Sequence, residues 1–161
     1  IVALGKGKFI DKEYIKEDSI RIEIHKKVSQ LNSLKDLEDL KLELEDRFGQ
    51  FSMELLTYMY EKLMKKQFSK LGINKLEQSK NKVKLYFTEE SSQLVDGEKL
   101  FMITSQFKYK VKLGYLKNKV EITINYENAS EHWIYIVVAF LESYLVGINK
   151  YNENLFERYN V

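Results

Sequence analysis

The hydrophobic residues of this chain change their spacing near residue 73. In the segment 34–48, leucines recur every three or four residues, as they do on one face of an amphipathic helix. Further on, Val83, Leu85 and Phe87 alternate with polar residues, which is the spacing of a strand with one buried face. The sequence therefore predicts an α+β fold, in which an N-terminal helical lobe is followed by an antiparallel sheet with covering helices.

The helical lobe is expected to contain three helices, each preceded by a serine. A serine at the N-cap accepts a hydrogen bond from the first turn, and a glycine commonly ends a helix. The expected helices run from about Ile20 to Leu31 after Ser19, from 34 to 48 between Ser33 and Gly49, and from about 53 to 71 between Ser52 and Gly72.

The second part is expected to form two hairpins separated by a helix. Alternation predicts strands at 83–87, 107–113 and 120–124, a turn at 116–118 and an intervening helix at 92–105. A last helix is expected from about Ser130, with apolar side chains that would cover the sheet. We expect one domain over 1–146, with the helical lobe at about 19–72, the sheet-containing part at about 73–146 and a C-terminal tail at 147–161.

Several classes of chemistry find no support in the sequence. There is no cysteine, so disulfides, thiolate zinc sites and cysteine nucleophiles are excluded, and His25 and His132 are too far apart to form a metal-binding motif. No glycine-rich phosphate loop is present. The longest charge-free apolar run, 133–141, is too short to span a membrane. We expect a cytoplasmic, non-catalytic chain without a metal or cofactor, and a hydrolase with an unrecognised carboxylate pair remains the weaker alternative.

The predicted helix at 34–48 has an unusual flank, because four acidic residues recur along it at helical spacing. Like charges at helical spacing repel by about 0.2–0.5 kcal/mol per pair. Leu42 projects away from the leucine spine on this flank, and Arg47 follows Glu43 in the favourable order for an ion pair. The flank is either an ordinary solvated face or a surface that binds a partner. Its acidic residues are Asp36, Asp39, Glu43 and Asp46.

A lysine-rich segment gives a second possible binding surface. Residues 99–120 include six lysines and no acidic residue, and Lys108, Lys110 and Lys112 alternate with aromatic and aliphatic residues. A basic track beside aromatic rings is typical of single-stranded nucleic-acid binding. Strict alternation instead places Phe107 and the other apolar residues in the core and the lysines in water, as in a half-buried antiparallel strand. A nucleic-acid-binding accessory module therefore remains the alternative function.

Five short segments carry a resemblance to the C-terminal domain of the bacterial transcription-repair coupling factor, the Mfd family. Residues 43–49 resemble the family signature Glu-Leu-x-Asp-Arg-Phe-Gly. Residues 21–27 are similar to the pattern Arg-x-x-x-Tyr-Lys-Arg, and 9–15 to Tyr-Ile-Pro-x-x-Tyr-Ile with Asp11 in place of proline. Phe51-Ser52 stands where Leu-Pro is usual, and Leu71-Gly72-Ile73 also fits. The resemblance is good over about 9–73.

The resemblance implies a regulatory domain of a large DNA translocase. The parent enzyme would use ATP and magnesium, bind double-stranded DNA, displace stalled RNA polymerase and recruit the repair protein UvrA. The domain would fold against the N-terminal UvrA-binding region of the same polypeptide and hide that surface. By position, the implied contact residues are Glu43, Asp46 and Arg47. We add Asp36, Asp39 and Leu42 from the geometry of the helix.

Overall fold

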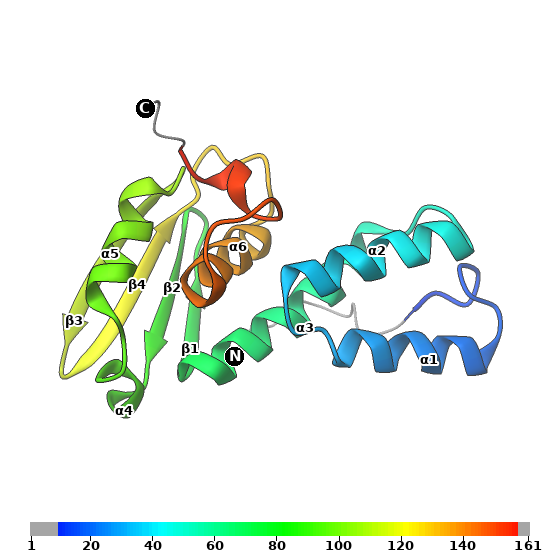
Figure 1. The fold of residues 1–161 in the computed structure, drawn as a ribbon, viewed down its shortest axis with the longest axis horizontal. Coiled ribbons are helices and arrows are strands. Elements are labelled where there is room, and N and C mark those ends of the chain that lie inside the picture. The colour runs from blue at the N-terminus through cyan, green and yellow to red at the C-terminus, as the bar shows by residue number, and fades with distance from the viewer. Residues whose placement is uncertain (1–9, 158–161) are drawn as a thin grey trace. The chain divides into compact units, whose positions relative to one another are not determined.

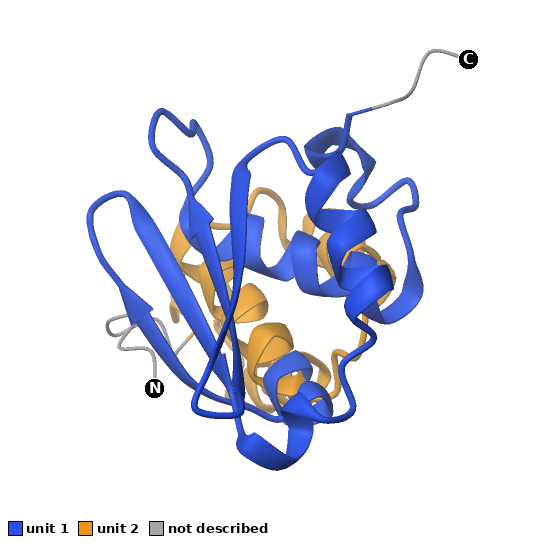
Figure 2. Ribbon diagram, turned by 90° about the vertical axis from the view of Figure 1, so that its left-hand side faces the viewer, with its two compact units in different colours: residues 1–2, 67–161 blue, residues 3–66 orange. Residues whose placement is uncertain are grey.

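The computed structural model describes residues 10–157, which form two compact units (Figures 1 and 2). One unit comprises residues 10–66 and the other residues 67–157. The boundary falls within helix α3 (Met53–Leu71). Within 10–157, no helix combines the length and the hydrophobicity that a membrane-spanning segment needs.

The first unit is helical and has a leucine-rich core. It contains α1 (Asp18–Ser29), α2 (Leu34–Phe48) and most of α3. Its apolar side chains recur at three- and four-residue spacing and are buried, which is the basis of helix packing in a small lobe. The buried side chains include Ile24 and Val28 of α1, Leu37, Leu40 and Leu44 of α2, and Leu55 of α3.

The caps of α2 and α3 confirm two of the predicted helices. The Ser33 hydroxyl oxygen accepts a hydrogen bond from the Asp36 amide at 3.1 Å, and the Ser52 hydroxyl accepts one from Leu55 at 3.1 Å. Gly49 and Gly72 follow the two helices with φ angles of 84° and 72°, a conformation that favours glycine.

The predicted start of the first helix was wrong. Helix α1 begins at Asp18 and not after Ser19, and its N-cap is Glu17. The Arg21 amide donates to the Glu17 carbonyl at 3.0 Å, so helical hydrogen bonding already begins at Glu17. Arg21 also binds the Ile15 carbonyl at 2.7 Å and pairs with Asp18, which fixes the chain as it enters the helix.

The second unit contains a four-stranded antiparallel sheet, as the α+β prediction requires. The strands are β1 (Ile73–Gln78), β2 (Lys82–Phe87), β3 (Lys110–Leu116) and β4 (Lys119–Asn125), in the order β1-β2-β4-β3. The register pairs Leu85 of β2 with Leu76 of β1 and with Ile122 of β4. These three side chains are buried, whereas β3 forms an exposed edge of the sheet.

Helices α5 (Gly97–Gln106) and α6 (Trp133–Val146) lie on one side of this sheet (Figures 1 and 2). Ten of the fourteen residues of α6 are buried, so this helix forms the centre of the unit. The segment after Gly147 ends in a short 3-10 helix, Glu153–Leu155, and is packed in the same unit. Phe156 lies 5.0 Å from Phe107, which in turn lies 5.0 Å from Phe140, as measured between ring centroids.

Three predicted boundaries in this unit were wrong. The single helix predicted over 92–105 is two helices, α4 (Glu89–Ser92) and α5, because the Asp96 carboxylate caps a new helix by accepting a hydrogen bond from Lys99 at 3.1 Å. The strand predicted from Phe107 begins at Lys110, since Phe107 instead forms an isolated bridge with Phe156. The last helix begins after His132 and not near Ser130.

Candidate functional site

Helix α2 presents its acidic flank to solvent. Asp39 and Asp46 are exposed, and Asp36 and Glu43 are half-buried. Leu42 is 58% exposed, as the helical geometry predicts for a residue outside the leucine spine. Asp36, Asp39 and Glu43 line a shallow depression of about 210 Å³ together with Lys27 of α1. The flank is thus an open surface that a flat partner could cover.

Glu43 is the centre of a network of four charges. Its Oε2 atom lies 2.6 Å from Nζ of Lys27 and 2.7 Å from Nη1 of Arg47. Nη1 of Arg47 also lies 2.8 Å from Oε2 of Glu23 on α1. The hydrogen bond from Lys27 lowers the pKa of Glu43, and the hydrogen bond from Arg47 lowers the pKa of Glu23. The network joins α1 to the C-terminal end of α2 and neutralises Glu43 within the unit.

The other acidic residues of the flank differ in their surroundings. Asp39 pairs with Lys35 at 2.8 Å, and the Asp36 carboxylate accepts a hydrogen bond from the Asn32 amide at 3.1 Å at the start of the helix. These contacts offset the repulsion expected along the flank. Among residues 10–157, none forms an ion pair or hydrogen bond with the Asp46 side chain. Asp46 is therefore the acid of the flank most readily available to a partner.

The last residues of the 43–49 segment have a structural role as well. The guanidinium carbon of Arg47 lies 4.9 Å from the centroid of the Phe48 ring. The Phe48 ring contacts Tyr14 edge-on at 5.8 Å, and the Tyr14 hydroxyl donates a hydrogen bond to the Gly49 carbonyl oxygen at 2.7 Å. Residues 10–15 and 43–49, from two of the segments that carry the resemblance, are thus brought together in the first unit, and Phe9 lies outside the described residues.

The three lysines of the alternative site are exposed at or just before β3. Lys108, Lys110 and Lys112 face water, and Phe107 is buried. The Tyr109 hydroxyl donates a hydrogen bond to the Glu131 carboxylate, and burial raises the pKa of Tyr109 to about 12. These two rings are engaged within the unit, whereas Tyr115 near the end of β3 is 65% exposed, so a single ring beside the lysines is open to base stacking.

The histidines are engaged in local contacts. His25 Nδ1 lies 2.8 Å from the Tyr58 hydroxyl, and His132 Nδ1 accepts a hydrogen bond from the Ile134 amide at 3.1 Å. No group of three potential metal ligands occurs in the part of the chain from 10 to 157. Two buried carboxyl groups, Glu61 and Glu142, were not identified from the sequence. They lie in different units, and Glu61 pairs with Lys65 at 3.1 Å.

Comparison with known proteins gives one consistent family. The TRCF domain family matches residues 5–98. The transcription-repair-coupling factor of Bacillus subtilis is 27% identical over 135 residues, which is 83% of this chain and 12% of the relative. The corresponding factor of Staphylococcus haemolyticus is 25% identical over 131 residues, or 81% of this chain and 11% of the relative. The chain therefore spans only about an eighth of the length of these relatives.

A solved structure has the same fold. The crystal structure of the C-terminal domain of a transcription-repair coupling factor superposes with a TM-score of 0.69, covering 94% of this chain and 92% of that one at 24% identity. This likeness extends to the sheet-containing unit, where the sequence resemblance is weak. Since the family match spans more than half of the residues, the chain belongs to the TRCF domain family.

Proposed function

We propose that this chain is a non-catalytic, autoinhibitory C-terminal domain of a transcription-repair coupling DNA translocase. In this proposal, the acidic flank of α2 covers the UvrA-binding N-terminal region of the same polypeptide. The family match and the relatives' name support the parent protein's identity. The rest of the parent would use ATP and magnesium, bind double-stranded DNA and act on stalled RNA polymerase.

The observation that supports a protein contact most directly is the combination of Asp46 and Leu42. Asp46 is an exposed carboxylate with no ion pair in residues 10–157, and Leu42 is a 58% exposed apolar side chain on the same flank. An unpaired charge beside an apolar side chain suits a partner surface that has arginine or lysine next to an apolar residue. Glu43 and Arg47 would hold the flank in a fixed conformation.

The contact would have to be reversible. Glu43 already has two cationic partners, so a basic group of the N-terminal region gains less from Glu43 than from Asp46. An interaction of a few kcal/mol suffices to hold the closed state, and a competing partner such as UvrA can reverse it. The mechanism is competition between this domain and UvrA for one surface.

The test is UvrA binding by the full-length parent protein with Asp46→Ala, alone and with Glu43→Ala. We expect each variant to bind UvrA more tightly than the wild type, because the masked surface is released more often. Glu45→Ala is the matched control, since Glu45 is an exposed acid of α2 on the opposite side of the core spine. Unchanged UvrA affinity in both Asp46 variants, with folding intact, would contradict the proposal.

A further inference from the structure

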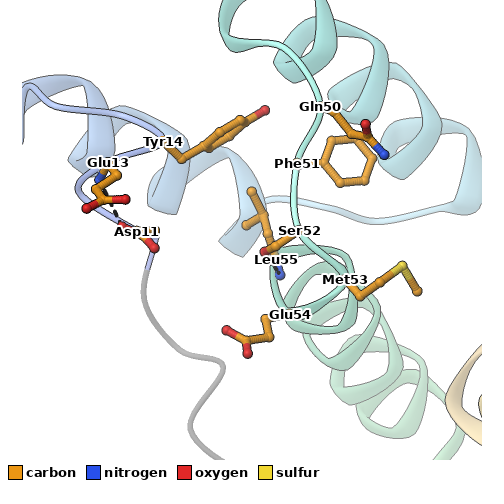
Figure 3. A pocket seen from close by; sticks show the side chains of 9 residues that line it. All are labelled: Asp11, Glu13, Tyr14, Gln50, Phe51, Ser52, Met53, Glu54 and Leu55. Carbon is orange, nitrogen blue, oxygen red and sulfur yellow. Dashed lines mark hydrogen bonds between the residues drawn. The ribbon is translucent and has the colours of Figure 1, made fainter.

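A pocket of about 680 Å³ lies in the first unit, between the turn at residues 11–14 and the start of α3 (Figure 3). Its volume is within the range of sites that hold a ligand or several side chains of a partner. None of the acidic residues of the α2 flank lines it. The pocket is therefore distinct from the surface assigned to the proposed function.

One side of the pocket is apolar. Phe51 lies on the connection into α3, Met53 is the first residue of that helix, and Leu55 lies between them and the turn (Figure 3). Met53 is 63% exposed although it lies at a concave site. Methionine adapts its shape to different apolar partners and is common at binding surfaces. This side can therefore receive an apolar side chain.

The pocket is also acidic. Asp11 and Glu13 lie on the turn, and Glu54 points toward that turn from the first turn of α3 (Figure 3). Among residues 10–157, no lysine or arginine lines the pocket. The Asp11 carboxylate accepts a hydrogen bond from the Glu13 amide at 2.8 Å, so the turn holds its acidic side chains in place. The charge of the site is complementary to a basic ligand.

The wall formed by Tyr14 is held in place from outside the pocket. Its hydroxyl contacts the carbonyl oxygens of Gly49 at 2.7 Å and Leu44 at 3.3 Å, and its ring contacts Phe48. A site whose walls are held before binding loses less conformational entropy when a ligand enters. The pocket is therefore already formed in this structure.

From these features we propose that the pocket docks a basic segment of a partner protein, with an apolar side chain against Phe51 and Met53 and a lysine or arginine among the three carboxylates. A ligand with only charged groups would leave the apolar wall uncovered. An anionic ligand would be repelled by the three carboxylates. The proposal goes beyond the function proposed above, because it assigns a second surface that does not include the α2 flank.

The experiment is an NMR titration of the 161-residue chain with three synthetic peptides of about ten residues. One alternates lysine or arginine with leucine, the second replaces every leucine by serine, and the third replaces every basic residue by glutamate. We expect saturable shifts at Met53 and Glu54 with the first peptide, weaker binding of the second and none of the third. Equal binding of all three peptides, or no binding of the first up to roughly millimolar concentration, would overturn the proposal.

Two charge reversals provide the matched comparison. Glu54→Lys changes the pocket, whereas Glu17→Lys makes the same change at the N-cap of α1, outside it. Both replace an acid at a helix N-terminus, so their effects on stability are similar. We expect Glu54→Lys to weaken the first peptide roughly fivefold and Glu17→Lys to leave its affinity within about twofold. An equal loss of affinity for the first peptide in the two variants would show an effect of net charge and refute a localised site. This conclusion does not depend on the outcome of the UvrA measurement.

Discussion

The Tyr14 hydroxyl donates a hydrogen bond to the carbonyl oxygen of Gly49, with 2.7 Å between the two oxygens. This contact joins the chain that precedes α1 to the residue that ends α2. It explains why an aromatic residue with a hydroxyl group is suited to this position, because the ring packs on Phe48 while the hydroxyl binds the carbonyl that follows α2.

Tyr14→Phe is expected to lower the free energy of unfolding by about 1 kcal/mol, because the ring contact with Phe48 remains while the hydrogen bond is lost. Urea denaturation followed by circular dichroism measures the change. Tyr115→Phe is the control, since Tyr115 is 65% exposed, and it should have almost no effect. Equal effects of the two substitutions would contradict the structural role of Tyr14.

Gly72→Ala is expected to be among the most destabilising small substitutions in the chain. A Cβ atom at Gly72 would lie 2.2 Å from the Cβ of Ser91, and the φ angle of 72° is unfavourable for alanine. The combined cost is about 2 kcal/mol or more.

Gly97→Ala provides the comparison for Gly72→Ala. Gly97 is the first residue of α5, and a Cβ there meets no atom within 4 Å. This change should be neutral or stabilising by up to about 1 kcal/mol. Thermal denaturation of the two variants under the same conditions tests the prediction, and similar melting temperatures would count against the close approach of Gly72 and Ser91.

The N-cap of α6 should make stability depend on pH. Burial lowers the pKa of His132 below its ordinary value of 6.5, and the neutral ring accepts the hydrogen bond from Ile134. The unfolded chain therefore takes up this proton at a higher pH than the folded chain. The stabilisation is present above about pH 6.5 and is lost as the pH falls through the lowered pKa of the folded protein.

His132→Asn tests this effect, because asparagine also caps a helix but does not titrate. The loss of melting temperature between about pH 7.5 and about pH 5.5 should be smaller in this variant than in the wild type. His25, whose pKa is lowered first by burial and then by Lys62, remains in both proteins and contributes equally. An unchanged pH dependence would show that the His132 cap does not contribute.

Nucleic-acid binding by the lysine-rich segment is expected to be weak. Phe107 is buried and Tyr109 is bonded to Glu131, so of the three aromatic residues at 107–115 Tyr115 alone is exposed for base stacking. Titration of the chain with single- and double-stranded DNA at two salt concentrations measures this. Micromolar affinity with a steep salt dependence, reduced by Lys110→Gln, would instead support the nucleic-acid-binding alternative.

Local sequence signals were sufficient for the parts of the fold that depend on local interactions. Helix α2 has a leucine spine and a cap at each end, Ser33 and Gly49, and both ends were predicted. The β3–β4 turn was also predicted, and its residues Lys117 and Asn118 have positive φ angles. In these elements the side chains that determine the structure are close together in the sequence.

The errors arose where distant residues or competing caps determine the structure. Asp96-Gly97 is a turn signal within the apparent 92–105 helix, and Asp96 was not recognised as a second N-cap. Phe107 was assigned to a strand by its alternation, but its bridge to Phe156 joins segments far apart in the chain. The burial of Glu61 and Glu142 likewise depends on packing that no local pattern shows.

In the candidate sites, too, some contacts follow from local sequence and others depend on the packing of distant segments. The order of Glu43 and Arg47 predicted their ion pair, and their separation of 2.7 Å agrees with it. The participation of Lys27 and Glu23 required the packing of α1 against α2. The pocket near Tyr14 could not be predicted, because it combines residues 11–14 with 50–55, and neither segment alone has a recognisable ligand-binding pattern.

In the part of the chain that the structure describes, strand β3 has one unpaired edge, and its lysines affect how the chain behaves at high concentration. If two copies approached edge to edge, Lys110 and Lys112 of one would face the like charges of the other, and this repulsion opposes intermolecular sheet extension. The same lysines that look like a nucleic-acid track would thus keep separate molecules from assembling into filaments through the exposed side of their sheets.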